Sequence, residues 1–254
     1  MRIMGQAVSS MYVWAIALLT ALVAISSYML RIFPWNAVAA VAIAVVLDLL
    51  VARFYHRRKP TVPWTAMITG LIIGSVAPSN ASMLLILLAV AVAIAARTWI
   101  RIKHVNIFNP AALGLLVALV AFSAGSEWWT SVSYNAYGIA IPLSIILVIA
   151  SYEAKRLSVA LSAVAVAFVL GLVLNGLGSI VASLLGINYF FALVMVTEPR
   201  TSPVKNTAQA VYGALVAALV AVLAYIGFTY PFLVALLLGN LAYAYYRARG
   251  NRLY

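Results

Sequence analysis

A short polar segment, Thr197–Pro203, carries the side chains of this chain that are best suited to chemistry. It reads Thr-Glu-Pro-Arg-Thr-Ser-Pro and directly follows the apolar run 189–196. Proline interrupts backbone hydrogen bonding, and hydrocarbon offers the freed groups no water in exchange. The hydroxyl, carboxylate and guanidinium groups of the segment therefore either cap a broken helix or bind a ligand at its end.

Two interpretations of this segment stay open, because side chains that cap a helix often line a site as well. In the first, Thr201 or Ser202 is the N-cap, Pro203 is the first residue of the next helix, and Glu198 pairs with a loop cation such as Arg200. In the second, the segment forms a polar pocket. Its candidate binding residues are Thr197, Glu198, Arg200, Thr201 and Ser202.

Asn109 and Pro110 form a second candidate site. Pro110 suits the first position of a helix, with Asn109 as its cap. A helix N-terminus inside protein also offers unpaired N–H groups to an anionic ligand. We expect Asn109 to approach Thr197–Ser202 from the other half of the chain and to face the same ligand.

Asp48 is an acidic residue within an apolar span. An intramembrane carboxylate by default indicates an ion pathway. Asp48 is also only about a turn and a half of helix from Arg53, so pairing near the membrane surface is the other interpretation.

The composition places these residues in a lipid bilayer. Of the 254 residues, 67% are hydrophobic and 8% are charged, whereas soluble domains carry about 25% charged residues. Cysteine is absent and both histidines, His56 and His104, lie in charged loops, which excludes thiolate iron–sulfur ligation and an intramembrane bis-histidine haem. A redox centre here would therefore be a flavin or a quinone. The net charge of +12 is divided among short loops, which argues against nucleic acid as a partner.

The apolar runs predict an all-α polytopic membrane protein with ten transmembrane helices. With the N-terminus inside, every Lys and Arg except Arg31 falls on the cytoplasmic side, as the positive-inside rule requires. We therefore expect both termini in the cytoplasm and the chain in the plasma or inner membrane. The predicted spans are 11–30, 35–52, 63–77, 82–97, 110–124, 135–152, 157–174, 179–196, 207–227 and 229–246.

These spans form a single transmembrane domain, 1–254, in two half-repeats, 1–133 and 134–254. Five helices in each half place the second half in inverted orientation. The third, fifth and eighth spans are short, and we expect them to be broken or tilted. The expected breaks are at Gly70/Gly74, Asn109-Pro110 and Gly186–Asn188. Broken segments in matching positions of two halves indicate a site near the midplane, although a Gly-x-x-x-Gly spacing more often marks close helix packing.

Several motifs resemble one known family. Phe108-Asn-Pro-Ala-Ala112 opens a helix, the segment 190–203 is followed by Gln209-Ala-Val-Tyr-Gly213, and Gly239-Asn240 stands in the last span. Together they are similar to the NqrB/RnfD family, the membrane subunits of the sodium-pumping NADH:quinone oxidoreductase and of the Rnf complex. The resemblance covers about Thr65 to Tyr246. It implies a ten-helix inverted-repeat fold similar to urea and ammonium channels, and electron transfer through flavin.

The loop after the fifth span departs from the family pattern. Redox members attach FMN to the threonine of a Ser-Gly-Ala-Thr motif, whereas Thr130 lacks these neighbours. We therefore expect no covalent flavin in this short, divergent member. The resemblance then implies a non-covalent FMN or riboflavin, or a quinone. It would be bound by Asn109, Pro110 and Thr197–Ser202, where Arg200 would favour anionic reduced flavin.

The leading functional interpretation is a non-catalytic membrane subunit of a flavin-linked electron-transport complex, with or without coupling to ion translocation. Its partners would be other membrane subunits and flavin-carrying subunits, and we expect no metal site. One alternative is a small-solute transporter or channel with a urea/ammonium-channel-like fold and no cofactor. Another is a membrane anchor for a redox partner.

Overall fold

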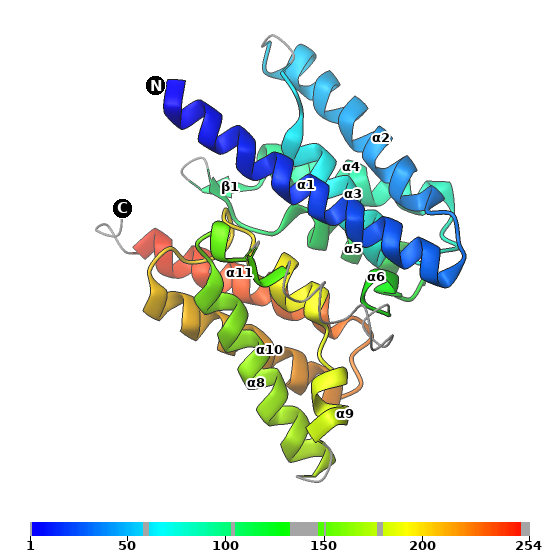
Figure 1. The fold of residues 1–254 in the computed structure, drawn as a ribbon. Coiled ribbons are helices and arrows are strands. Elements are labelled where there is room, and N and C mark those ends of the chain that lie inside the picture. Colours follow the sequence, from blue (N-terminus) through cyan, green and yellow to red (C-terminus); the bar gives the residue numbers. More distant parts are fainter. Residues whose placement is uncertain are drawn as a thin grey trace. The chain divides into compact units, whose positions relative to one another are not determined.

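The computed structural model describes residues 2–57, 61–102, 105–132, 147–149, 151–176 and 180–249. Within these ranges every regular element except one short hairpin is helical, so the all-α prediction is confirmed (Figure 1). The chain divides into two compact units, residues 1–99 with 110–133 and residues 100–109 with 134–254. Residues 100–109 thus belong to the second unit, although they lie within the first predicted half-repeat.

The first unit is built around a short buried helix, α3 (Trp64–Val76). This helix contacts each of the other α-helices of the unit. At about 1.5 Å rise per residue, 13 residues are too few to cross a bilayer core. α3 is instead enclosed by the other helices of the unit. The other elements are α1 (Arg2–Leu30), α2 (Trp35–Leu50) with the π-helical turn η1 (Val51–Tyr55), α4 (Met83–Trp99), α5 (Pro110–Ala121) and α6 (Trp129–Val132).

Gly70 and Gly74 allow α3 to lie directly against α2. A Cβ atom on Gly74 would come within 2.3 Å of the Ala37 Cα atom, and one on Gly70 within 2.6 Å of the Val41 Cα atom. The prediction of a break at these glycines is wrong, because α3 is continuous from Trp64 to Val76. The Gly-x-x-x-Gly spacing serves close helix packing instead.

The second unit begins with a hairpin and continues with helices. Strand β1 (Arg101–Ile102) pairs antiparallel with β2 (Val105–Asn106), which places Arg101 opposite Asn106. α8 packs against α10, where Gly213 has room for no Cβ because the Val159 carbonyl oxygen would lie 2.3 Å away. α10 also packs against α11. The helices are α8 (Leu157–Asn175), α9 (Ile180–Leu185), the π-helical turn η4 (Phe191–Met195), α10 (Asn206–Tyr225) and α11 (Pro231–Arg249).

The predicted break in the eighth span is confirmed. α9 ends at Leu185, and helical structure resumes at Tyr189 before η4. Asn188 stabilises the new start, since its side-chain Oδ1 atom accepts a hydrogen bond of 2.9 Å from the Phe191 N–H. An Asn at this position is a favoured N-cap.

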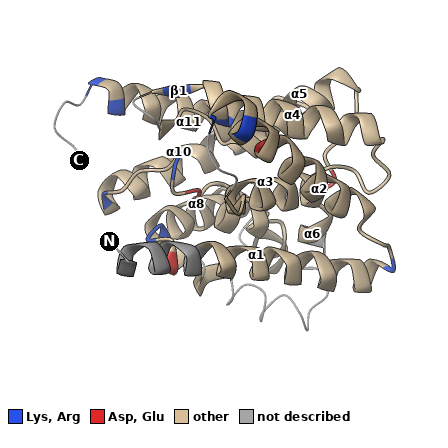
Figure 2. Cartoon of the chain, turned by 90° about the horizontal axis from the view of Figure 1, so that it is seen from above, with Lys and Arg blue, Asp and Glu red and all other residues tan. Residues whose placement is uncertain are grey.

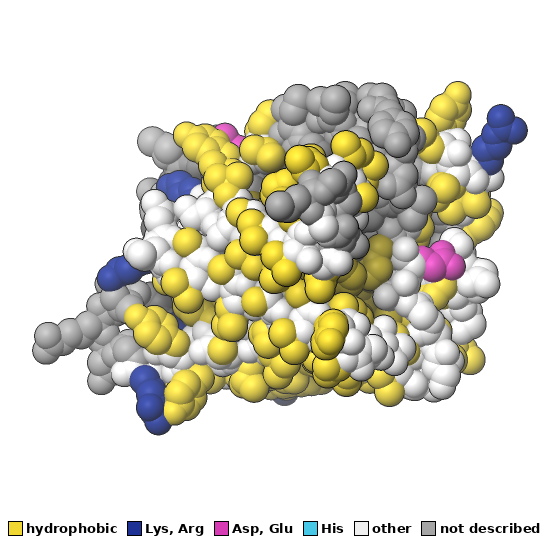
Figure 3. Space-filling model, turned by 90° about the horizontal axis from the view of Figure 1, so that it is seen from below, with side chains coloured by type: hydrophobic (Ala, Val, Ile, Leu, Met, Phe, Trp, Pro, Cys, Tyr) yellow, Lys and Arg dark blue, Asp and Glu magenta, His cyan; other side chains and the backbone are white. Residues whose placement is uncertain are grey.

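The described helices fit a membrane environment. Four of them are long and apolar enough to cross a bilayer: Tyr12–Leu30, Trp35–Tyr55, Leu157–Leu174 and Asn206–Tyr225. Figure 3 shows hydrophobic side chains spread over the visible surface, and Tyr28 and Trp14 are among the most exposed of them. Figure 2 shows Lys and Arg mainly at helix ends and in loops. Most of the predicted sixth span, 135–152, lies outside the described residues.

Candidate functional site

Asn240, at the middle of α11, is the centre of a buried polar network in the second unit. Its side chain is fully buried. The Asn240 Oδ1 atom accepts a 2.8 Å hydrogen bond from the Asn109 N–H, and its Nδ2 atom donates to the Tyr212 hydroxyl at 2.6 Å. A longer bond of 3.4 Å runs from Nδ2 to the Thr201 carbonyl oxygen. One amide thus connects the hairpin end, α10 and the segment that follows η4.

Asn109 lies against the end of η4, as its predicted approach to the polar segment requires. Its Nδ2 atom donates to the Met195 carbonyl oxygen at 3.3 Å, two residues before Thr197. Pro110 begins α5 as predicted and is buried. Asn109 itself is 2% exposed, so its amide satisfies backbone groups inside the unit.

The hydroxyl groups of the polar segment bond within the segment and to η4. Thr197 donates to the Leu193 carbonyl oxygen at 2.8 Å, and Ser202 donates to the Glu198 carbonyl oxygen at 2.7 Å. The Thr201 hydroxyl donates to the Glu198 carboxylate at 2.9 Å. These bonds fold the segment into a turn whose hydroxyl-bearing residues are all buried.

The predicted helix cap at Thr201 or Ser202 is wrong. α10 starts at Asn206, its N-cap position is Lys205, and no side-chain cap bond is made there. Pro203 therefore lies in the loop and not at the first helical position. The physical reason is that both hydroxyls already bond to Glu198, which closes a separate turn before the helix begins.

Arg156 holds the polar segment from the start of α8. Its Nε atom donates to the Ser202 hydroxyl at 2.9 Å and its Nη2 atom to the Pro199 carbonyl oxygen at 3.1 Å. A third bond of 3.0 Å reaches the Lys155 carbonyl oxygen, which also accepts from Gln209 at 2.9 Å. Burial lowers the pKa of the Arg156 guanidinium. Several acceptors are needed here because a buried charge without hydrogen bonds is costly.

Arg200 differs from the other candidate binding residues of the polar segment because it is exposed, whereas Thr197, Thr201 and Ser202 are buried and Glu198 is half-buried. The turn around Glu198 and the bonds from Arg156 fix its backbone, and its side chain lies at the surface of the unit. It is therefore the residue of this segment that is best placed to meet a charged group from outside.

Asp48 pairs with Arg97 in the first unit. The Arg97 guanidinium bonds to the Asp48 carboxylate and donates to the Thr65 hydroxyl at 2.6 Å, so the pair joins α2, α4 and α3. The prediction that Asp48 pairs with a cation is confirmed, but the partner is Arg97 and not the predicted Arg53. Arg97 is on a neighbouring helix and almost completely buried, which makes it the stronger compensating charge.

The first unit has its own polar cluster where α3 ends. The Asn36 side chain donates to the carbonyl oxygens of Pro78 and Ser79 at 2.7 and 3.0 Å, and the Glu127 carboxylate accepts from the Ser79 N–H at 2.7 Å. The Trp129 ring N–H donates to the Gly74 carbonyl oxygen at 2.7 Å. These contacts satisfy the backbone where the helix stops at proline.

Polar residues of these clusters that were not singled out from the sequence include Asn36, Arg97, Arg156 and Tyr212. Arg97 and Arg156 were assigned only to the cytoplasmic loops by the charge count. The usable indication for Tyr212 was its place in the Gln209–Gly213 motif. For Asn36, nothing in the local sequence distinguishes a buried amide from a surface one.

No protein-family model matches the chain, and no curated protein sequence is significantly similar to it. Among the described residues, no group of three or more His, Cys, Asp or Glu side chains is placed to hold a metal ion. The fold and the polar groups define the class: a helical protein with four described helices long and apolar enough to cross a membrane, and with a buried polar network at a broken helix.

Proposed function

We propose that the chain is an integral membrane subunit of a flavin-linked electron-transport complex, positioning a non-covalent FMN or riboflavin, or a quinone. One observation carries the proposal. Asn109, Thr201, Tyr212 and Asn240 come from the separate motifs that resemble the NqrB/RnfD family, and they bond to one another in the second unit. Motifs so far apart in the sequence have no local reason to meet, so their convergence supports treating them as one site.

The buried residues and Arg200 have different parts in this site. The amides and hydroxyls of Asn109, Thr197, Thr201, Ser202 and Asn240 hold the loop in place. Arg200, which is exposed on that loop, would contact the bound group. Placement and electrostatic tuning are what a protein contributes to cofactor chemistry, and a guanidinium beside a flavin stabilises its anionic reduced form.

The finer topology belongs to the same proposal: ten spans in a five-plus-five inverted repeat, with both termini in the cytoplasm and the chain in the plasma or inner membrane. Matching prolines support it. Pro78 and Pro199 follow α3 and η4, and Pro110 and Pro231 open α5 and α11. The two members of each pair are 121 positions apart. A common spacing between matching breaks is expected of an internal repeat.

A second candidate is a small-solute transporter or channel without a cofactor. The observation in its favour is that helical structure stops shortly before a proline in both units, after Val76 and after Met195. Interrupted helices in the two halves of a repeat form the substrate sites of many transporters. In such a protein the Asp48–Arg97 pair would be part of the ion pathway or of its gate.

Extraction of the protein purified in mild detergent, with acid for a flavin and with organic solvent for a quinone, tests the first proposal. We expect a flavin or a quinone to be released in an amount comparable to the protein, and we expect Arg200→Gln to reduce that amount or to shift the flavin absorption. Arg53→Gln, an exposed cation of the first unit, is the matched control. Protein that releases neither flavin nor quinone would overturn the cofactor-binding function and leave the transporter, which solute uptake in proteoliposomes then tests.

A further inference from the structure

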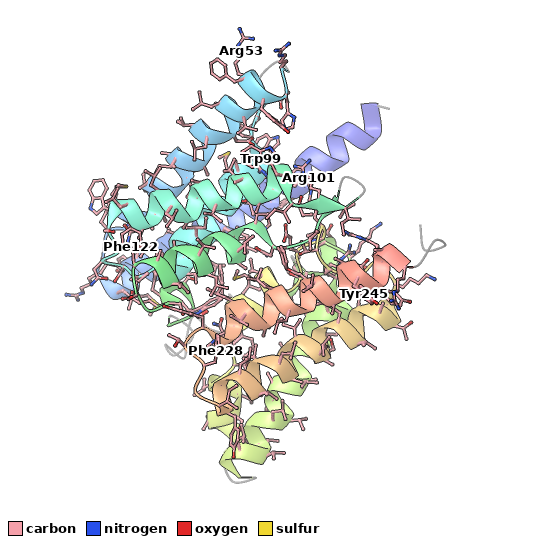
Figure 4. The ribbon with its side chains drawn as sticks, turned by 180° about the vertical axis from the view of Figure 1, so that it is seen from behind. Arg53, Trp99, Arg101, Phe122, Phe228 and Tyr245 are labelled. Carbon is pink, nitrogen blue, oxygen red and sulfur yellow. The ribbon has the colours of Figure 1, made fainter. Side chains whose placement is uncertain are left out.

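Cationic side chains of the second unit gather around the β1–β2 hairpin. Arg101 on β1 lies directly across the hairpin from Asn106. From the last turn of α11, the Arg247 Nη2 atom lies 3.5 Å from the Asn106 carbonyl oxygen. Figure 4 labels Arg101 on the hairpin and Tyr245 near the same end of α11. The hairpin is therefore held beside the basic end of that helix.

Arg200 contributes a third guanidinium, because Asn240 bonds both to Asn109, three residues after the hairpin, and to Thr201, the neighbour of Arg200. Partial burial, and then the positive charge of Arg200, lower the pKa of the Arg101 side chain. Like charges repel each other. An anion bound between Arg101 and Arg200 would attract both guanidinium groups and offset this repulsion.

Asn106 supplies an independent indication of a ligand. Its side chain is 3% exposed, and within the described part of the chain its Nδ2 atom has no hydrogen-bond acceptor. A buried donor without an acceptor is unfavourable, and natural structures rarely keep one without a reason. Asn106 pairs with Arg101 across the hairpin, so their side chains share one face of it, and an acceptor atom bound on that face would satisfy the amide.

We propose that Arg101, Asn106, Arg200 and Arg247 form a binding site for a phosphate group. Guanidinium groups match the oxygens of a phosphate both in charge and in geometry. A single-atom anion offers the charge but not the several oxygens. The group belongs either to the headgroup of an anionic phospholipid, since basic clusters at the cytoplasmic ends of membrane helices recruit such lipids, or to a soluble phosphate compound. The assignment rests on the hairpin geometry and does not require the chain to bind flavin.

Thermal unfolding of the full chain tests the site and distinguishes the two sources. One arm adds inorganic phosphate to the detergent-solubilised protein, against chloride at equal ionic strength. The other arm compares nanodiscs of phosphatidylcholine with and without phosphatidylglycerol. We expect stabilisation in at least one arm, with the apparent affinity roughly tenfold or more weaker in Arg101→Gln and Arg200→Gln, as for loss of a charge-assisted hydrogen bond. Both side chains are exposed, so these variants should fold.

The pattern of stabilisation decides the outcome. An effect of phosphatidylglycerol alone supports the site with a lipid headgroup as its occupant, whereas an effect of inorganic phosphate supports a soluble occupant. The control is Arg53→Gln, on η1 of the first unit, which should respond like the unchanged protein. No stabilisation in either arm, or an equal loss in the control, would overturn the proposal. Because neither arm contains flavin, the result is independent of the extraction experiment.

Discussion

In both units a proline follows the end of a short helix, but different side chains bond to the carbonyl oxygen of that proline. In the first unit, Asn36 at the start of α2 donates to the Pro78 carbonyl oxygen at 2.7 Å. In the second, Arg156 at the start of α8 donates to the Pro199 carbonyl oxygen at 3.1 Å. In each unit, therefore, a side chain at the start of one helix donates to a backbone carbonyl oxygen that follows the end of another helix.

The difference lies in where each unit places its buried cation. The first unit satisfies its proline carbonyl with a neutral amide and pairs its buried cation, Arg97, with Asp48. The second unit uses its buried cation, Arg156, on the proline loop itself, with backbone and hydroxyl acceptors. The proline carbonyl oxygen is thus bonded by a neutral amide in the first unit and by a charged guanidinium in the second. The charged donor occurs at the loop that carries Arg200.

The largest expected effect tests the charge pair of the first unit. Arg97→Met should lower the free energy of unfolding by about 3–5 kcal/mol, because it leaves the largely buried Asp48 carboxylate without its compensating charge. Denaturant unfolding in mixed micelles measures the loss. The double variant Arg97→Met/Asp48→Leu should recover most of it. If the double variant were as unstable as the single one, the pair would matter for packing and not for charge.

The next effect tests the neutral network of the second unit. Asn240→Leu keeps the side-chain size and removes the partners of the Asn109 N–H and the Tyr212 hydroxyl. Since each buried group left unsatisfied costs about 1–3 kcal/mol, we expect a loss of roughly 2–4 kcal/mol in the same unfolding assay. A change below the error of the assay would show that the network does not stabilise the unit.

The positions of most helices could be predicted because the lengths of apolar runs and the prolines between them are local properties. α2 and α8 begin at Trp35 and Leu157, as the spans 35–52 and 157–174 predicted. The break before η4 was also predictable, since Gly186–Asn188 contains both a flexible residue and a helix cap.

The partners of the polar side chains could not be predicted in the same way. Asp48 is within reach of Arg53 along its own helix, but it pairs with Arg97 because α4 packs beside α2. Gly70 and Gly74 were interpreted as a break because the sequence does not show that another backbone fills the space beside them. Both depend on how helices pack, which residue spacing along one helix does not determine.

Replacing the two proline-loop donors compares the units directly. Arg156→Met should cost about 2–3 kcal/mol, since hydrogen bonds made by charged groups contribute more than neutral ones. Asn36→Leu should cost about 1–2 kcal/mol, because it removes two neutral bonds. Unfolding of both variants in one detergent gives the difference. Equal losses would mean that the charge of Arg156 adds nothing to its role as a donor, and the contrast between the units would disappear.

The last comparison concerns packing, where the two units should respond alike. Gly74→Ala and Gly213→Ala each place a Cβ within 2.3 Å of a backbone atom of the neighbouring helix, and overpacking of this kind costs about 1–3 kcal/mol. Gly125→Ala is the matched control, because no atom lies within 4 Å of its added Cβ, and we expect it to change stability by less than about 0.5 kcal/mol. Similar losses for Gly74 and Gly213, with none for Gly125, would place the difference between the units in their polar clusters. A loss confined to one unit would show instead that their helix contacts differ as much as their charges do.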